Sequence, residues 1–320
     1  MSDEALKHKL VSIVVPCYNE SEGIEVFFHT ILSILDGMPD IRFEIVCVDD
    51  GSRDDTLVKL LARVERDQRF HVVELSRNFG KEAALTAGID NTRGDAIIPI
   101  DADLQDPPEL IPVLIAEWRK GAEVVLARRA DRSTDSYIKR KTAALFYRFH
   151  NRVSSVKIPE NVGDFRLIDR SVVDALKSLP ERQRFMKGLF AWVGFRTVTV
   201  DYTRHARAMG KSKFSGWKLW NLALEGITSF STAPLKIWTY IGIAGAALTF
   251  CYASFIVLRT LIRGVEVPGY ASLLVAVLFF GSLQLVSVGV LGEYIGRIYL
   301  ETKQRPSYLV RRHHGSRDEP

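Results

Sequence analysis

The sequence predicts an α/β domain built on a mostly parallel sheet, followed by a two-helix transmembrane hairpin. Up to about residue 130, apolar runs of strand type alternate with segments of helical period. Polar or charged residues follow each of these runs, and two long uncharged runs fall late in the chain. A length of 320 residues leaves room for one large domain and a smaller unit.

Five apolar runs have the composition of buried strands. Their expected ranges are Val11–Val15, Phe43–Val48, His71–Leu75, Ile97–Ile100 and Glu123–Ala127. Helical periodicity is found over about 21–35, 54–66 and 81–92. This alternation implies helices on both faces of the sheet. In such sheets, ligands bind beyond the carboxyl ends of the strands.

The fourth strand runs directly into Asp101-Ala102-Asp103-Leu104-Gln105. If the chain stays extended, the side chains of Asp101, Asp103 and Gln105 point to one side. Hard oxygen ligands of this kind suit Mg²⁺ or Mn²⁺, which usually keep substrate phosphates as further ligands. A solvated acidic turn is the alternative for this motif when it is taken alone.

The other expected strands also end in polar residues, so an active site is predicted at one edge of the sheet. These residues are Tyr18, Asn19, Glu20, Asp49, Asp50, Arg77, Asn78, Arg128 and Arg129. The sequence lacks the glycine-rich fingerprint of dinucleotide-binding folds and the phosphate loop of nucleotide hydrolases. We therefore expect another kind of phosphate-containing substrate.

Two uncharged runs predict membrane spans. Ile237–Leu258 has no charged residue, and a helix of that length measures about 33 Å, close to a bilayer core of about 30 Å. The second run is Val267–Gly292. Lysines and arginines lie mainly before the first run and after the second, which places both ends in the cytosol. Glycines in both spans permit close packing, and association into homo-oligomers is possible.

Composition and charge indicate which classes of molecule the chain can bind. The net charge is +5 and no nucleic-acid motif is present, so anionic lipid and phosphorylated substrates are preferred over nucleic acid. A basic, aromatic segment at 136–153 and an apolar, aromatic segment at 217–230 are typical of a membrane interface, with an ordinary packed helix as the alternative for the first. The three cysteines show no metal or disulfide spacing, and residues 1–9 do not form a signal peptide.

Four motifs together resemble the family 2 glycosyltransferases with a GT-A, Rossmann-like fold. They are VSIVVPCYNE (11–20), VDDGSRDDT (48–56), DADLQ (101–105) and GDFRL (163–167). GKSKF (210–214) and the two uncharged runs extend the resemblance to the polyprenyl-phosphate sugar transferases, including dolichyl-phosphate mannose synthase and the GtrB-type bactoprenol glucosyltransferases. The expected domains are a catalytic domain (1–210), a mobile loop with an amphipathic helix (211–233), two transmembrane helices (234–300) and a basic cytoplasmic tail (301–320).

The resemblance implies roles for individual residues. Asp103 and Gln105 would hold Mg²⁺ or Mn²⁺. Asp164 stands where the family's candidate base lies, and it would act catalytically with Asp101, Asp103 and Arg128. The residues expected to bind the nucleotide are Pro16, Tyr18, Glu20, Asp49, Asp101, Lys211 and Lys213. Arg128 would bind the lipid phosphate, with Arg140 as a second candidate.

The implied reaction transfers one sugar, with glucose from UDP-glucose as the best candidate, to polyprenyl phosphate at the cytoplasmic face of the plasma or inner membrane. A phosphate monoester has a second pKa near about 6, so the acceptor needs little deprotonation. Asp164 is then either a base or an orienting residue. A single displacement inverts the anomeric centre, so an α-linked donor gives a β-linked product.

Two further functions are compatible with parts of the sequence. A processive polysaccharide synthase carries Gln-x-x-Arg-Trp before its spans, whereas this chain has Arg182-Gln183-Arg184-Phe185. A non-catalytic scaffold that binds nucleotide would not need the Asp101, Asp103 and Gln105 set. Transfer of mannose or an aminosugar to the same lipid also fits the residues.

Overall fold

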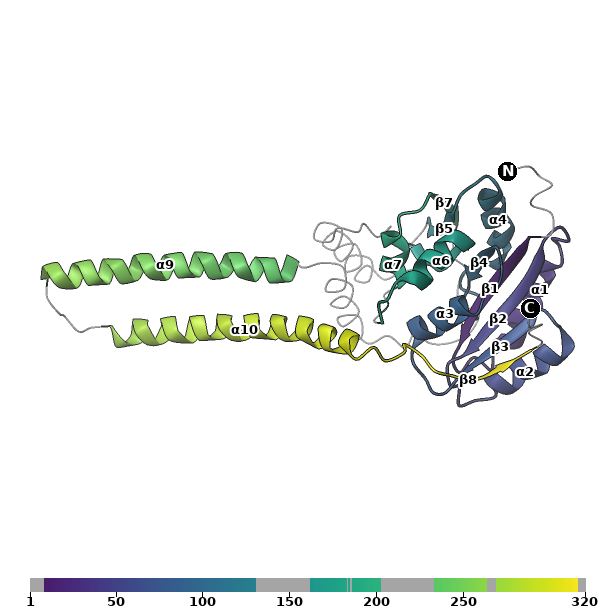
Figure 1. Cartoon of the computed structure of the whole chain (residues 1–320), viewed down its shortest axis with the longest axis horizontal. Coiled ribbons are helices and arrows are strands. Elements are labelled where there is room, and N and C mark those ends of the chain that lie inside the picture. Colours follow the sequence, from purple (N-terminus) through teal and green to yellow (C-terminus); the bar gives the residue numbers. More distant parts are fainter. Residues whose placement is uncertain are drawn as a thin grey trace.

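The computed structural model describes residues 9–130, 162–182, 184, 186–202, 233–263 and 269–315. The described strands form one eight-stranded sheet in the order β7-β5-β6-β4-β1-β2-β3-β8. Helices flank this sheet, and two long helices project away from it (Figure 1). An α/β domain with helices on both faces is thereby confirmed.

The five expected strands, β1 to β5, begin and end close to the predicted positions, and the sheet contains further strands. The strands are β1 (Leu10–Cys17), β2 (Arg42–Asp49), β3 (Phe70–Leu75), β4 (Ala96–Pro99), β5 (Val124–Arg129), β6 (Val162–Asp169), β7 (Thr197–Tyr202) and β8 (Val310–His314). The helices of the sheet domain are α1 (Ile24–Leu35), α2 (Thr56–Arg66), α3 (Lys81–Asp90), η2 (Pro108–Leu110), α4 (Ile111–Arg119), α6 (Arg170–Ser178) and α7 (Met186–Trp192).

The sheet is mixed rather than mostly parallel. The four strands β3-β2-β1-β4 run parallel, and β5 and β7 pair parallel with each other. Between β4 and β5 lies β6, which is antiparallel to both. The sequence did not predict β6, because Gly163 and Asp164 interrupt its apolar pattern. Its buried residues nevertheless alternate, with Phe165 and Leu167 on one face and Ile168 on the other.

Two hydrophobic layers fix the sheet in place. On one face, β1 packs against apolar side chains of α1 and α4. On the other face, α3, α6 and α7 cover β1, β4, β5 and β6. Helix α3 approaches β1 so closely that a Cβ on Gly88 would lie 2.3 Å from Cγ1 of Val14. Only glycine fits there without a shift in the neighbours, and α3 is held tightly against the strands.

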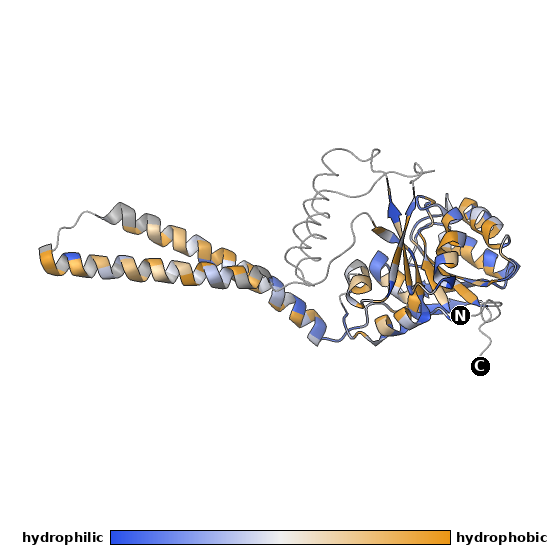
Figure 2. Cartoon of the chain, turned by 90° about the horizontal axis from the view of Figure 1, so that it is seen from above, coloured by the Kyte–Doolittle hydropathy of each residue, from blue (hydrophilic) through white to orange (hydrophobic). Residues whose placement is uncertain are grey.

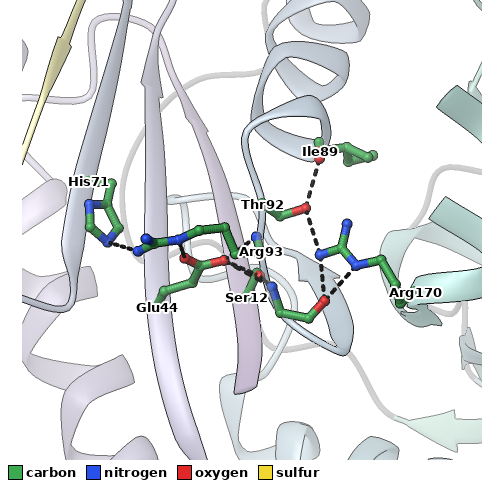
Figure 3. A network of polar contacts seen from close by, with 8 residues as sticks. Ser12, Glu44, His71, Ile89, Thr92, Arg93 and Arg170 are labelled. Atoms are coloured by element: carbon green, nitrogen blue, oxygen red, sulfur yellow. Dashed lines mark hydrogen bonds and ion pairs between the residues drawn. The ribbon is translucent and has the colours of Figure 1, made fainter. Parts of the chain in front are cut away.

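A network of hydrogen bonds around the buried carboxylate of Glu44 lies at the edge of the sheet opposite the carboxyl ends of the parallel strands (Figure 3). Glu44 is buried and accepts hydrogen bonds from Ser12 Oγ (2.5 Å) and from the backbone N–H groups of Arg93 (2.6 Å) and Gly94 (3.2 Å). The guanidinium of Arg170 donates to the Gly94 carbonyl. Because these contacts join β1, β2, α6 and the turn before β4 to one another, this network serves architecture.

Two long helices follow the sheet domain, α9 (Ala233–Arg263) and α10 (Tyr270–Thr302). They lie side by side and carry mainly apolar residues (Figures 1 and 2). Many large apolar side chains on them are exposed, including Phe250 and Leu285. Within the described residues, one segment, Phe279–Thr302, is long and apolar enough to cross a membrane, and none of it is buried.

The chain returns from α10 to the sheet domain. Strand β8 pairs antiparallel with β3 and completes one edge of the sheet. The sequence analysis expected only a basic tail over 301–320, so this strand is an addition to the prediction. The expected loop and amphipathic helix at 211–233 fall, apart from Ala233, outside the described residues.

Candidate active site

The acidic loop after β4 turns instead of continuing as a strand. Residues 102–104 form a turn, and Leu104 has a positive φ of 53°. The carboxylate of Asp103 accepts a hydrogen bond from the backbone N–H of Gln105 (3.1 Å), as aspartate commonly does in turns. The extended arrangement expected from the sequence is therefore wrong. The side chains of Asp101, Asp103 and Gln105 are all partly accessible in this turn.

Lys81 joins two of the expected catalytic carboxylates. Its Nζ lies 2.7 Å from Oδ2 of Asp101 and 2.8 Å from Oδ2 of Asp164. Asp164 reaches this edge because β6 is antiparallel, which brings its first residues beside the ends of its neighbours. The structure thus unites Asp101 and Asp164, which lie 63 positions apart in sequence, through a residue that the sequence analysis did not name.

Burial and neighbouring charges have opposing effects on the pKa values of Asp101 and Lys81. Burial raises the pKa of Asp101, and the nearby carboxylates of Asp164 and Asp103 raise it further, while Lys81 lowers it. Burial disfavours the charged form of Lys81, but the carboxylates of Asp164 and Asp101 outweigh this and raise the pKa of its ammonium. The cluster therefore contains a permanent cation between acidic groups.

Lys81 owes its place to the loop between β3 and α3. The buried carboxylate of Asp50 accepts hydrogen bonds from the backbone N–H groups of Phe79 (2.7 Å) and Gly80 (2.9 Å). Burial raises the pKa of Asp50, although these hydrogen bonds oppose the shift. A Cβ on Gly51 would lie 2.6 Å from the carbonyl carbon of Arg77, so the two loops approach closely. Lys81 follows immediately, as the first residue of α3.

The first and second strands bring the expected nucleotide-binding residues together. Asp49 is buried at the end of β2 and accepts from the backbone N–H of Ser52 (3.2 Å), and burial raises its pKa. Pro16 and Glu20 are partly buried, whereas the Tyr18 side chain is exposed. These four residues thus occupy the carboxyl ends of β1 and β2, as predicted.

Asp54 joins the loop after β1 to the loop after β2. Its carboxylate accepts from the backbone N–H of Ser21 (3.2 Å) and from both the N–H (3.1 Å) and the hydroxyl (2.5 Å) of Thr56. These hydrogen bonds outweigh partial burial and lower the pKa of Asp54 to about 2. Nearby, the side chain of Asn19 accepts from the backbone N–H of Arg53 (2.9 Å).

Arg128 lies on the strand beside β6 and is engaged by an acidic neighbour. Its guanidinium donates to Asp201 through Nε (2.6 Å) and Nη2 (2.9 Å), and Asp201 is its register partner on β7. This side-chain hydrogen bond raises the pKa of Arg128 and lowers the pKa of Asp201. One strand residue further, the Tyr202 hydroxyl donates to the buried Asp106 (2.5 Å).

Other expected site residues cannot be placed. Arg140, Lys211 and Lys213 lie outside the described residues. Within the described ranges, no three His, Cys, Asp or Glu side chains gather closely enough to hold a metal by themselves. A metal at the acidic loop would therefore have to draw further oxygen ligands from substrate or water.

Comparison with known sequences decides the family. A family model described as glycosyl transferase family 2 matches residues 12–177, more than half of the chain. The chain belongs to glycosyl transferase family 2. The match begins in β1 and ends in α6, so it contains both the acidic loop and Asp164.

Near relatives of this family 2 glycosyltransferase match almost its whole length. The bactoprenol glucosyl transferase of Shigella phage SfX is 55% identical over 301 residues, which cover 94% of this chain and 98% of that protein. A prophage bactoprenol glucosyl transferase homolog of Escherichia coli (strain K12) is 54% identical over 302 residues, covering 94% and 98%. An uncharacterized glycosyltransferase of Synechocystis is 54% identical over 300 residues, covering 94% of each chain.

Among solved structures, the glucosyl-3-phosphoglycerate synthase of Mycobacterium tuberculosis gives a TM-score of 0.48 at 22% identity. It covers 69% of this chain and 76% of that one.

Sequence reasoning missed Lys81 although a signal was present. The residues predicted at this edge included Arg77 and Asn78 but not Lys81, which begins the helix expected over 81–92. A lysine directly after Gly80, at the same edge as Asp101, is the type of residue that balances a cluster of carboxylates. The contact itself depends on β6, whose position in the sheet was not predicted.

Proposed function

We propose that this glycosyltransferase transfers a single glucose from UDP-glucose to polyprenyl phosphate, with inversion, at the cytoplasmic face of a membrane. The observation that carries the proposal is the identity of 54–55% to bactoprenol glucosyl transferases over 94% of the chain. This identity extends past the family domain into the segment that contains α9 and α10. A lipid-linked acceptor explains why a transferase domain is joined to long apolar helices.

The acidic loop is the proposed site of a divalent cation. Asp103 and Gln105 supply a carboxylate and an amide oxygen, which are hard ligands that fit Mg²⁺ or Mn²⁺. Both side chains are partly accessible at the carboxyl end of β4, so the donor's phosphates can reach them. When bound, the cation would act as a Lewis acid that neutralises the departing diphosphate.

The nucleotide would lie over the ends of β1 and β2. Asp49 is proposed to accept hydrogen bonds from the base, and Asp101 to lie by the ribose and pyrophosphate. Pro16, Tyr18 and Glu20 line the entrance in this proposal, since they occupy the end of β1 and the residues directly after it. Lys211 and Lys213 remain candidates for closing on the diphosphate, from outside the described residues.

The carboxylate of Asp164 is proposed to orient the reacting groups. Polyprenyl phosphate is largely a dianion near pH 7, so it needs no strong base. The ion pair with Lys81 holds Asp164 in one place, which suits an orienting role. Attack by the phosphate oxygen on the anomeric carbon expels UDP in one displacement, so the product is β-linked.

The acceptor phosphate is proposed to meet Arg128, with Arg140 as a second candidate. Arg128 is exposed, and its ion pair with Asp201 fixes the guanidinium at the end of β5. An arginine that is already oriented by one carboxylate keeps further N–H donors for a phosphate. Such a contact lowers the repulsion between the two anionic substrates.

Both long helices are proposed to span the membrane as a hairpin. The segment Phe279–Thr302 meets the length and composition of a span, and α9 contains the uncharged run Ile237–Leu258. Exposed apolar side chains along both helices would be costly in water and favourable in lipid. Lysines and arginines beyond the two outer ends support a cytosolic location for the sheet domain and both termini.

Transfer to a lipid is the test of this function. Purified protein in detergent is incubated with Mg²⁺, polyprenyl phosphate and one labelled nucleotide sugar at a time. We expect label from UDP-glucose, and much less from mannose or aminosugar donors, in a lipid that carries a single sugar. A growing polymer would support a polysaccharide synthase instead, and no transfer from any donor would refute the proposal.

A further inference from the structure

We propose that Lys81 is a positioning residue of the transfer reaction, whose ammonium couples Asp101 on the donor side to Asp164 on the acceptor side. The inference rests on the proposed function and adds a residue to it. The two ion pairs, of 2.7 and 2.8 Å, are its starting observation. Among the residues that the structure describes, no other lysine pairs with two of the carboxylates expected to act in catalysis.

The backbone that carries Lys81 is rigid. Asp50 fixes the two residues before it through backbone hydrogen bonds, and the closely packed Gly88 holds the rest of α3 against β1. At the other end of the side chain, the ammonium is held by one carboxylate from the loop after β4 and one from β6. The Lys81 side chain as a whole is 48% exposed, so the ion pairs lie near the surface of the carboxyl edge.

Lys81 also changes the net charge of the carboxylate cluster. The carboxylates of Asp103 and Asp164 lie near enough to Asp101 to raise its pKa, and Lys81 is the counter-charge that Asp101 and Asp164 share. With the ammonium present, these four ionised groups sum to −2, and without it to −3. The ammonium therefore weakens the attraction of the substrate-free site for a divalent cation. As a consequence, the cation binds mainly together with the anionic diphosphate.

Three variants test the proposal. Lys81→Met removes the ammonium while keeping an apolar stem, and Lys81→Arg keeps the positive charge. Lys120→Met is the matched control, because Lys120 pairs only locally with Glu117 on an exposed surface. For each protein we measure kcat and KM for glucose transfer, the melting temperature, and binding of Mn²⁺ alone to the substrate-free protein by electron paramagnetic resonance of the free ion.

We expect Lys81→Met to lower kcat about 100-fold, the size of effect produced by misplaced catalytic groups. Its KM for UDP-glucose should change much less, and it should bind Mn²⁺ alone about tenfold more tightly. Lys81→Arg should recover part of kcat and restore weak Mn²⁺ binding. Lys120→Met should match the wild type throughout.

The results separate this inference from the proposed function. A wild type that transfers no sugar refutes the function. An active wild type with an equally active Lys81→Met refutes the role of Lys81. A lower melting temperature with unchanged or weaker Mn²⁺ binding would show a purely structural role and would also overturn the proposal. If Lys81→Met does not fold, Lys81→Gln replaces it under the same criteria.

Discussion

The aspartates at the carboxyl edge fall into two groups according to what their side chains accept. Asp50 and Asp54 accept hydrogen bonds from backbone N–H groups and hold loops together. Asp101 and Asp164 face an ammonium instead. Asp50 and Asp54 thus serve the loops, whereas Asp101 and Asp164 carry the proposed chemistry together with Asp103.

The charge of Asp54 should make stability depend on pH in a defined direction. Its pKa is lowered from an ordinary 3.8 to about 2 in the folded protein. The ionised carboxylate thus stabilises the fold above about pH 4, and this contribution is lost as pH falls through the folded pKa. Asp54→Asn should lower the free energy of unfolding at pH 7 by about 1 kcal/mol, after allowance for solvent screening.

This prediction is checked by thermal unfolding of the wild type and Asp54→Asn between pH 7 and pH 2. The difference between the two proteins should narrow as pH falls from 4 to 2. Asp55→Asn is the control, because that neighbouring side chain is exposed. A difference that is constant across this range would show that the charge of Asp54 does not stabilise the fold.

Single residues were predictable where the chemistry is local. The motif at 101–105 was found from its residue types, but its turn was not, because the bond from Gln105 N–H to Asp103 competes with extension. The polar residues at the ends of the parallel strands do lie at one edge of the sheet. Which carboxylates serve the fold there could not be read from the sequence, since the backbone partners come from distant loops.

The antiparallel strands are the elements that the sequence concealed. Strand β6 contains Gly163, Asp164 and Arg166, so its alternation is weak. Strand β8 reads Val-Arg-Arg-His-His, a charged pattern typical of a protected sheet edge. It is stabilised by contacts with Glu74, which lies 3.3 Å from Arg311 and 3.1 Å from His314. The parallel strands β1 to β5 were predictable because both of their faces are largely buried.

Removing β8 should destabilise the sheet domain. A chain that ends at Tyr308 loses the ladder with β3, the bond from Ser76 N–H to Leu309, and both basic partners of Glu74. We expect the free energy of unfolding to fall by about 2–4 kcal/mol, because buried groups of β3 lose their partners. The exposed edge should also promote aggregation.

The measurement is thermal unfolding in detergent, with aggregation followed by light scattering. A chain that ends at Gly315 is the matched control, because it retains all of β8. The control should melt with the wild type. Equal melting temperatures for both truncated chains would contradict a stabilising role of β8.

At the scale of the whole molecule, the sheet domain and α10 are joined at several points. Glu301 near the end of α10 accepts from the backbone N–H of Arg182 (3.0 Å), and the Tyr308 hydroxyl donates to Asp90 (2.8 Å). Strand β8 then pairs with β3. These contacts fix how the domain meets α10, and therefore how its carboxyl edge faces a membrane in which α10 is embedded.

The membrane hairpin can be tested with the three native cysteines. Cys17 and Cys47 are buried in the sheet, and Cys251 lies on α9 with its side chain exposed. If α9 spans a bilayer, lipid covers Cys251. A membrane-impermeant maleimide should then label no thiol in native inverted vesicles and three after denaturation in SDS.

A Glu65→Cys variant provides the positive control for this labelling. Glu65 is exposed on α2, so the new thiol should react in inverted vesicles, where a cytosolic domain faces outward. Labelling of Cys251 in the native protein would place α9 outside the membrane. Lack of labelling at the new cysteine, with labelling after permeabilisation, would reverse the proposed orientation.

Large-scale organisation was predictable only in part. Uncharged runs identified the long helices, because twenty or so apolar residues without charge rarely form a soluble helix. The strand order β4-β6-β5-β7 was not predictable, since it depends on pairings across 131–161, where the alternation of strands and helices stops. The return of the chain from α10 to the sheet was not predicted either, because the sequence of a charged edge strand resembles that of a basic tail.

The central claim is that the acidic loop after β4 holds the cation that assists transfer of glucose to a lipid phosphate. The most direct measurement is the rate of β-linked glucosyl-lipid formation by wild type and Asp103→Asn, each with Mg²⁺ and after chelation. We predict that chelation abolishes transfer by the wild type and that Asp103→Asn lowers its rate at least about 100-fold. Undiminished transfer by the chelated wild type, or by Asp103→Asn, would contradict the claim.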